Sequence, residues 1–159
     1  MLFRSAAAAA QSTGRILDSL KEVLPQANEC EVLGTWANHD STGNYYAIRS
    51  SGSLLGYAIE SWGKGYQSTI SVLVAVDLDL TVKAVHILGQ QETEGLGTRI
   101  MEPEFLSQFS GKRLEQLAVT TEGAADRINA ITAATISSRA VTEDAVAGAV
   151  AFLKQKLSR

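Results

Sequence analysis

Two runs of β-branched and aliphatic residues, joined by a short acidic segment, constrain the fold of this chain more than any other feature. Ile70–Val76 and Val82–Leu88 lie within the sequence TISVLVAVDLDLTVKAVHILG and are connected through DLDL. Valine and isoleucine favour extended backbone, and a short polar connection between two such runs is typical of a hairpin. The sequence therefore predicts a long β-hairpin, whose two strands run antiparallel.

The residues before this hairpin predict one helix and then more strands. Residues 6–24 combine alanine, the best helix former, with apolar residues at helical spacing, and Pro25 ends that helix. Because the strands that follow are joined by short loops, we expect an antiparallel sheet. The expected strands span residues 29–36, 44–50 and 54–67, with a turn around residues 38–44 and a glycine-rich turn after the third.

Two helices are predicted after the hairpin. Residues 102–117 predict a short helix, with Pro103 suited to its first turn and Gly111 to its end. A longer helix is expected from about Ser137 to Leu157. We therefore predict a single α+β domain, with a mainly antiparallel sheet, an N-terminal helix, a short middle helix and a long C-terminal helix. The residues on one face of that last helix are Val146, Val150, Leu153 and Leu157.

Composition and charge exclude several classes of protein. The 159 residues include 14 basic and 17 acidic side chains, and no cluster of lysines and arginines suggests a nucleic-acid surface. The single cysteine, Cys30, forms no internal disulfide, and His39 and His86 are far apart, so we expect no metal site. No run of about 18 apolar residues predicts a membrane-spanning helix.

The N-terminal residues MLFRSAAAAAQSTG are too weakly apolar for a secretory signal. We expect residues 1–14 to be a tag or the remnant of a stalk, and residues 15–159 to form the domain. The domain shows no internal repeat and no linker.

Two polar segments are candidates for chemistry, and the first is GQQETEGLGTRI, residues 89–100. Gly95 and Gly97 allow the backbone to approach a ligand closely or to adopt positive φ. Glu92, Thr93 and Thr98 offer polar contacts. The alternative is a solvated connection with turn glycines.

The second segment is NAITAATISSRAV, residues 129–141, a hydroxyl-rich start of the last helix. A helix N-terminus carries unpaired N–H groups and partial positive charge, which favour a phosphate. The alternative is plain capping by Thr135, Ser137 or Ser138. The motifs of Walker-type phosphate loops, zinc proteases, thiol redox proteins and nucleophile elbows are absent.

Taken together, ETEGLG and, about forty residues later, NAITAATISSRAV resemble the FMN-binding domain family. That family includes the G subunit of Rnf-type electron-transport complexes and the C subunit of sodium-translocating NADH:quinone reductases. Its members show a segment like H-x-ETPGLG, then DA(I/V)SGAT(I/V)(S/T)S, then a long C-terminal helix. The resemblance covers roughly residues 15–157, and LKEVLP, GKGYQSTISVLVAVD and PEFLSQFSGK occur in the same order.

The resemblance implies that Thr135 is joined to FMN through a phosphoester bond. In the family a dedicated flavin transferase makes this bond, with FAD as the donor. The small Ala133 and Ala134 leave room beside such a hydroxyl. The residues that the resemblance places around the cofactor are Glu92, Thr93, Leu96, Gly97, Thr98, Thr132, Ala133 and Ala134, with Tyr66 as a wall.

The chain departs from the family pattern at five positions. In the first segment, Gln90 replaces a histidine and Glu94 a proline. In the second, Asn129 replaces an acidic residue, Thr132 a serine and Ala133 a glycine. The acidic residue is the one that the transferase recognises in the family.

The function implied by the resemblance is an electron relay, in which Thr135 is an attachment point and no general acid–base pair is needed. The expected partners are the flavin transferase and other subunits of a membrane ion-pumping redox complex. The expected location is the outer, periplasmic face of a bacterial inner membrane, here as a soluble domain. The alternatives are a module that binds FMN or another small ligand reversibly, and a structural α+β protein with an ordinary capped helix.

Overall fold

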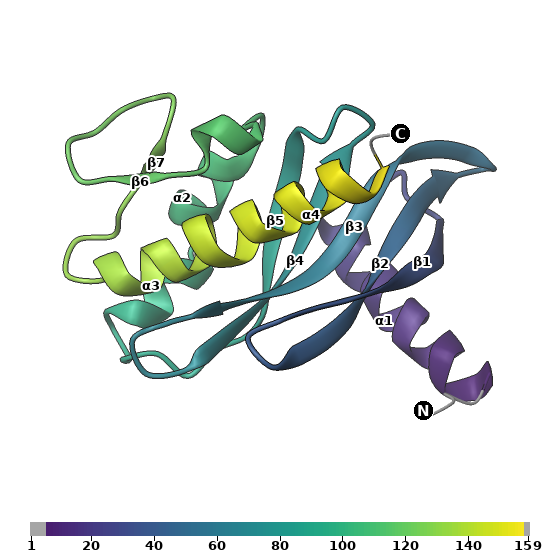
Figure 1. The fold of residues 1–159 in the computed structure, drawn as a ribbon, viewed down its shortest axis with the longest axis horizontal. Coiled ribbons are helices and arrows are strands. Elements are labelled where there is room, and N and C mark those ends of the chain that lie inside the picture. The colour runs from purple at the N-terminus through teal and green to yellow at the C-terminus, as the bar shows by residue number, and fades with distance from the viewer. Residues whose placement is uncertain (1–5, 158–159) are drawn as a thin grey trace.

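The structure, a computed structural model, describes residues 6–157, except the side chains of residues 6–13 and Val23. Five strands form one antiparallel sheet in which each strand pairs with the next along the chain (Figure 1). This order confirms the predicted antiparallel sheet, including the hairpin of the last two strands. The strands are β1 (Glu29–Asn38), β2 (Ser41–Ser50), β3 (Ser53–Lys64), β4 (Thr69–Asp77) and β5 (Val82–Gly89).

The turn between β1 and β2 is shorter than the sequence predicts. Only His39 and Asp40 separate the two strands, and their φ angles are 50° and 61°. Two consecutive positive φ values are typical of a type I′ turn, whose twist matches that of paired strands. The expected turn over residues 38–44 is therefore wrong in length, because residues 41–44 already pair with β1.

Helices cover both faces of the sheet, which gives the molecule three layers (Figure 1). One face carries α1 (Ala6–Val23), which ends before Pro25 as predicted. A helical run from Thr135 to Leu157 covers the other face. Side chains of β4 alternate between the two cores, because Leu73 packs with the α1 side and Val74 with the helical run.

The long C-terminal helix is confirmed, although it begins at Thr135 rather than Ser137. It consists of α3 (Thr135–Arg139), the π-helical segment η4 (Ala140–Val146) and α4 (Ala147–Leu157). The hydroxyl of Ser61 in β3 donates a hydrogen bond of 2.7 Å to the carbonyl of Ala145 in η4. A Cβ at Gly63 would lie 2.0 Å from the carbonyl oxygen of Ala140, so β3 passes close against η4.

The segment between the sheet and the final helix is less regular than the sequence predicts. The helix expected over residues 102–117 is instead a set of short elements: α2 (Pro103–Leu106), η2 (Ser107–Phe109) and η3 (Leu114–Gln116). Buried Phe105 and Phe109 tie α2 and η2 into the core under the helical run, and partly buried Leu114 of η3 packs against the same core. The segment also contains η1 (Gly97–Met101) and the parallel strand pair β6 (Val119–Thr120) and β7 (Ile128–Asn129), which the sequence did not predict.

The N-terminal helix α1 begins at Ala6 and continues across the expected boundary between residues 14 and 15. Residues 1–5 of the expected tag or stalk lie outside the described residues, and the division into residues 1–14 and 15–159 stays a prediction. Within residues 6–157, no helix combines the length and the apolar character that a membrane crossing requires.

Candidate functional site

The two candidate segments lie side by side and enclose a cavity of about 660 Å³. We call residues 90–98 the Glu92 loop and residues 129–138 the Thr135 loop. The hydroxyl of Ser137 donates a hydrogen bond of 2.7 Å to Oε1 of Glu92 and so joins the two loops. The residues that line the cavity are Tyr66, Gln67, Thr93, Leu96, Gly97, Ala133, Ala134, Thr135, Ile136 and Ser137.

Glu92 does not line the cavity, but its carboxylate holds the surrounding segments together. Its side chain is only 6% exposed, and both carboxylate oxygens accept several hydrogen bonds. Oε1 accepts the backbone N–H of Tyr66 at 2.7 Å, while Oε2 accepts the N–H of Gln67 at 3.0 Å and that of Ser68 at 2.9 Å. Oε2 also accepts the Ser68 hydroxyl at 2.8 Å. One carboxylate therefore fastens the β3–β4 turn, the Glu92 loop and the start of α3.

These hydrogen bonds decide the charge of Glu92. Burial acts to raise the pKa of Glu92, but the hydroxyls of Ser137 and Ser68 and the backbone N–H groups of Gln67 and Tyr66 outweigh it and lower that pKa. Donors that face both oxygens stabilise the ionised form over the protonated form. The group is a carboxylate at neutral pH.

Two glycines allow the close packing around this carboxylate. A Cβ at Gly65 would lie 2.4 Å from Oε1 of Glu92. A Cβ at Gly97 would lie 2.5 Å from Cβ of Glu92 and 2.9 Å from the hydroxyl oxygen of Ser137. Gly95 has a φ of +80°, which is the positive φ that the sequence suggests for this loop.

The Thr135 loop turns sharply before it enters the helix. Ala133 has a φ of 65°, a left-handed conformation that strongly favours glycine, and it stands where the family has glycine. Ser138 closes the turn, because its hydroxyl accepts the N–H of Ile131 at 3.0 Å and donates to the carbonyl of Ala134 at 2.8 Å. The turn leads directly into Thr135, the first residue of α3.

Thr135 does not cap the helix. The N-cap residue is Ala134, and no side chain makes a capping hydrogen bond there. The Thr135 side chain is half-buried and lines the cavity, and among residues 6–157 its hydroxyl has no hydrogen-bond partner. The capping interpretation is therefore wrong for Thr135, while Ser137 and Ser138 use their hydroxyls to fix the loop.

The structure divides the predicted site residues into two groups. Glu92 is buried and does not line the cavity, and the Thr98 hydroxyl accepts the N–H of Gly95 at 3.0 Å. Thr132 lines a separate cavity, described below, and not this one. Contact of any of these residues with the cofactor stays a prediction. The predicted residues that do line the cavity are Tyr66, Thr93, Leu96, Gly97, Ala133, Ala134 and Thr135.

Three cavity residues were not predicted as ligand contacts. Gln67 donates through Nε2 to the hydroxyl of Thr93 at 2.9 Å, and so extends a polar edge across both sides of the cavity. Ile136 is 53% exposed although it is strongly apolar, and exposed Tyr66 and Leu96 share this character. Ser137 was considered only as a cap. The only sequence signal for Ile136 was its place directly after Thr135.

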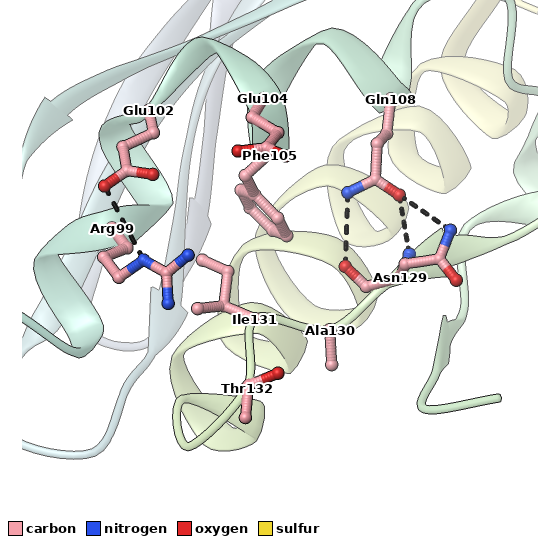
Figure 2. Close-up of a pocket in the computed structure, with 9 residues that line it drawn as sticks. All are labelled: Arg99, Glu102, Glu104, Phe105, Gln108, Asn129, Ala130, Ile131 and Thr132. Atoms are coloured by element: carbon pink, nitrogen blue, oxygen red, sulfur yellow. Dashed lines mark hydrogen bonds and ion pairs between the residues drawn. The ribbon is translucent and has the colours of Figure 1, made fainter. Parts of the chain in front are cut away.

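A second cavity of about 400 Å³ is lined in part by the first residues of the Thr135 loop, from Asn129 to Thr132. Figure 2 shows its walls: the Arg99–Glu102 ion pair, Glu104 and Phe105 from one side, and Gln108 with Asn129 from another. Asn129 and Gln108 are connected there by several hydrogen bonds. The position that is acidic in the family is therefore occupied here by a fully engaged amide.

The fold and the first cavity define a class of protein. The volume lies within the range of cofactor pockets, and the lining joins apolar side chains to a helix start. Such a lining fits a ligand that combines a flat apolar ring with a phosphate. The apolar side chains can cover the ring, and the N–H groups at the helix start can donate to the phosphate. No three His, Cys, Asp or Glu side chains form a metal-binding group in the described part of the chain. The class is a cofactor-binding α+β domain.

Comparison with known families gives the particular assignment. The model of the FMN-binding domain family matches residues 65–150, which include both loops and most of the final helix. This chain belongs to the FMN-binding domain family, and its cofactor is FMN. The residues present fit that group, since the cavity offers apolar walls, N–H donors and the Thr135 hydroxyl, which has no partner within the described part of the chain.

Similar proteins carry names from one kind of complex. The chain is 35% identical over 142 residues to the G subunit of the ion-translocating oxidoreductase complex of Methanosarcina acetivorans, covering 86% of this chain and 73% of that one. It is 35% identical over 101 residues to the G subunit of the proton-translocating ferredoxin:NAD(+) oxidoreductase complex of Clostridium ljungdahlii. That match covers 63% of this chain and 55% of the relative, so this chain spans little more than half of its length.

Two solved structures share the fold. The C subunit of the Na(+)-translocating NADH-quinone reductase from Parabacteroides distasonis superposes with a TM-score of 0.67 at 18% identity, covering 99% of this chain and 100% of that one. NqrC from Shewanella oneidensis gives a TM-score of 0.60 at 23% identity, covering 86% and 74%. These similarities confirm the predicted α+β fold class.

Proposed function

We propose that this chain is the FMN-carrying electron-transfer subunit of a membrane-bound, ion-translocating redox complex, with FMN joined to Thr135 by a phosphoester bond. The family assignment and the names of the relatives support the cofactor and the kind of complex. The observation that carries the covalent link is the Thr135 hydroxyl, which lines the cavity and has no partner among the described residues.

The start of α3 would hold the phosphate. The first N–H groups of a helix have no intrahelical partner, and here they follow Thr135 directly. Their partial positive charge contributes about 0.3–1 kcal/mol at an exposed site, which helps to hold a phosphate that the covalent bond retains. Ala133 and Ala134 keep the approach to the hydroxyl open, because neither carries a side chain beyond Cβ.

The apolar lining would hold the ring. Tyr66 is 67% exposed, and with Leu96 and Ile136 it contributes exposed apolar surface to the cavity. Covering this surface is favourable by about 25 cal/mol for each Å² removed from water. Gln67 and Thr93 add amide and hydroxyl groups to the same lining and would orient polar edges of the ring.

When bound, FMN supplies one- and two-electron redox chemistry that side chains lack. Thr135 would then serve retention and placement and take no part in electron transfer. Attachment requires a flavin transferase and FAD: the Thr135 oxygen bonds to the flavin-side phosphorus, the pyrophosphate bond breaks, AMP leaves and the hydroxyl proton is released. The other partners would be further subunits of the complex at the outer face of the membrane.

The test is co-expression of the chain with a flavin transferase, followed by denaturation, intact mass measurement and in-gel flavin fluorescence. We expect an added mass of FMN less one water, and its loss in Thr135→Val. Thr132→Val is the matched control, because Thr132 is a neighbouring exposed hydroxyl outside the cavity, and it should keep the flavin.

Other results would reject the covalent link. Flavin that washes out on denaturation would support the alternative, a module that binds FMN or another small ligand reversibly. The cavity itself favours that alternative over a purely structural protein, because it is large enough to hold a ligand without a covalent bond. Absence of flavin before and after denaturation would reject both.

A further inference from the structure

The Thr135 loop is fixed at its beginning by an unusual use of one side-chain amide. Gln108, from η2, accepts the backbone N–H of Asn129 through Oε1 at 2.7 Å and donates through Nε2 to the carbonyl of Asn129 at 3.2 Å (Figure 2). The Gln108 amide thus bonds both backbone groups of Asn129, as a neighbouring strand would. Because the Asn129 N–H requires an acceptor, the amide of Gln108 can lie in only one orientation.

The side chain of Asn129 extends the same network to the preceding loop. Its Oδ1 accepts the N–H of Ala124 at 3.1 Å, and its Nδ2 donates to the carbonyl of Ala124 at 3.4 Å. Nδ2 also donates to Oε1 of Gln108 at 3.1 Å. Both donors and the acceptor of the Asn129 amide are therefore engaged.

The backbone that follows is bonded residue by residue towards Thr135. The N–H of Ala130 donates to the carbonyl of Thr120 at 2.9 Å, and the N–H of Ile131 donates to the Ser138 hydroxyl at 3.0 Å. The N–H of Ala134 then donates to the carbonyl of Ile131 at 2.9 Å. A shift at Asn129 would pass along this chain of bonds to the helix start.

A carboxylate at position 129 does not fit this network. It has no donor for Oε1 of Gln108, so two acceptor oxygens would face each other where a hydrogen bond of 3.1 Å now lies. Rotation of the Gln108 amide would relieve that contact but would break both of its bonds to the Asn129 backbone. Glu102 and Glu104 line the same cavity and would add repulsion, with Arg99 as the only cation among the lining residues.

We infer that Gln108 and Asn129 are a matched pair of positioning residues that hold the Thr135 hydroxyl in register for flavin attachment, and that the pair requires an amide at position 129. This inference rests on the proposed function. It gives a prediction opposite to that of the family pattern, in which an acidic residue at this position favours attachment.

The experiment measures the initial rate of covalent flavin incorporation with purified flavin transferase and FAD, below the melting temperature of every variant. We expect Asn129→Asp to slow attachment about tenfold, because one hydrogen bond becomes a repulsive contact. Gln108→Glu keeps the acceptor for both Asn129 donors but places an oxygen against the Asn129 carbonyl, where a hydrogen bond of 3.2 Å now lies, and should also slow attachment about tenfold. Gln108→Leu removes both groups and should also slow attachment about tenfold.

Two controls separate positioning from loss of stability. Ile48→Val shortens a buried side chain in the core beside α1, lowers the melting temperature without touching the loop, and should leave the rate unchanged. In a Gln108→Leu background, Asn129→Asp should have less effect, because the nearer opposing oxygen is gone and only the Ala124 carbonyl, at 3.4 Å, remains.

The outcomes distinguish this inference from the proposed function. An Asn129→Asp variant that attaches flavin at or above the wild-type rate would overturn the inference and support recognition of an acid. An equal effect of Asn129→Asp in both backgrounds would overturn it as well. A wild-type chain that takes up no flavin at Thr135 would reject the proposed function, and the inference with it.

Discussion

The two loops that form the cavity are held in place by different chemistry. The Glu92 loop depends on one buried carboxylate that accepts bonds from three backbone N–H groups and two hydroxyls. The Thr135 loop depends on neutral groups, the amides of Gln108 and Asn129 and the hydroxyl of Ser138. The position of the first loop therefore depends on one side chain, whereas several weaker hydrogen bonds from different side chains hold the second loop in place.

This difference matches the tasks of the two loops. The Glu92 loop joins the sheet to the helix start, and a charged acceptor forms stronger hydrogen bonds than a neutral one. In the function that we propose, the Thr135 loop presents a hydroxyl beside a phosphate, and another negative charge there would repel that phosphate. The two loops also differ in backbone strain. The positive φ of the Glu92 loop is at Gly95, where it costs little, whereas that of the Thr135 loop is at Ala133.

Removal of the Glu92 carboxylate should have the largest effect. Glu92→Ala leaves several buried donors without an acceptor, and we expect a loss of about 3 kcal/mol or more in the free energy of unfolding. Urea denaturation measures it, with Glu94→Ala as the control, because Glu94 is exposed in the same loop. A loss below about 1 kcal/mol, closer to that of a surface substitution, would show that the Glu92 loop does not depend on this one carboxylate.

The next prediction concerns pH. Glu92→Gln should cost about 2 kcal/mol at neutral pH, because its NH₂ group faces donors. The pKa of Glu92 is lowered from its ordinary value of 4.5, so the unfolded state binds the proton more readily. The carboxylate therefore stabilises the fold above pH 4.5, and this contribution is lost as the pH falls through the lowered pKa.

The measurement compares urea denaturation of the wild type and Glu92→Gln between neutral and acid pH. The difference between them should be constant above pH 4.5 and shrink below it. Asn129→Ala is the comparison from the Thr135 loop. Its loss in the free energy of unfolding should not change in this way near pH 4.5, because an amide does not titrate. A Glu92→Gln difference that grows on acidification would disprove the assigned charge.

A smaller effect is expected from a methyl group between the loops. Gly97→Ala places a Cβ within 2.5 Å of Glu92 and 2.9 Å of the Ser137 hydroxyl, and we expect a loss of about 1–3 kcal/mol. Gly14→Ala in α1 is the control, since its Cβ would meet nothing within 4 Å, and it should be neutral or stabilising. Equal thermal stabilities of the two variants would show that Glu92 and Ser137 can move apart to admit the methyl group without loss of stability.

The smallest effect should be a gain in stability. Ala133→Gly relieves a left-handed alanine, and after the entropy cost of glycine we expect a gain of about 0.5–1 kcal/mol. Ala134→Gly is the matched control, because Ala134 has a φ of −137° and should gain nothing. Thermal unfolding distinguishes the two, and a loss for Ala133→Gly would show that the strain is absent.

Much of the fold could be predicted because its elements follow from local patterns. The β4–β5 hairpin came from two β-branched runs, and the final helix from apolar residues at helical spacing. The short middle helix is present and begins at Pro103 as expected, but the residues from 102 to 117 are divided among three short elements, because their apolar side chains pack inward from each of them. The β6–β7 pair is only two residues long in each strand and has no pattern to detect.

The sequence by itself determined the α+β class, the two loops and the family, since these depend on residue patterns along the chain. Tertiary structure decided what individual residues do. Glu92 was expected beside the cofactor, yet its partners come from three segments that meet only in the fold. Asn129 was a departure from a motif, and its role depends on Gln108, which lies 21 residues away in the chain. Hydrogen bonds act over about 3 Å in space, so side-chain partners that are far apart in the sequence become visible only once the chain is folded.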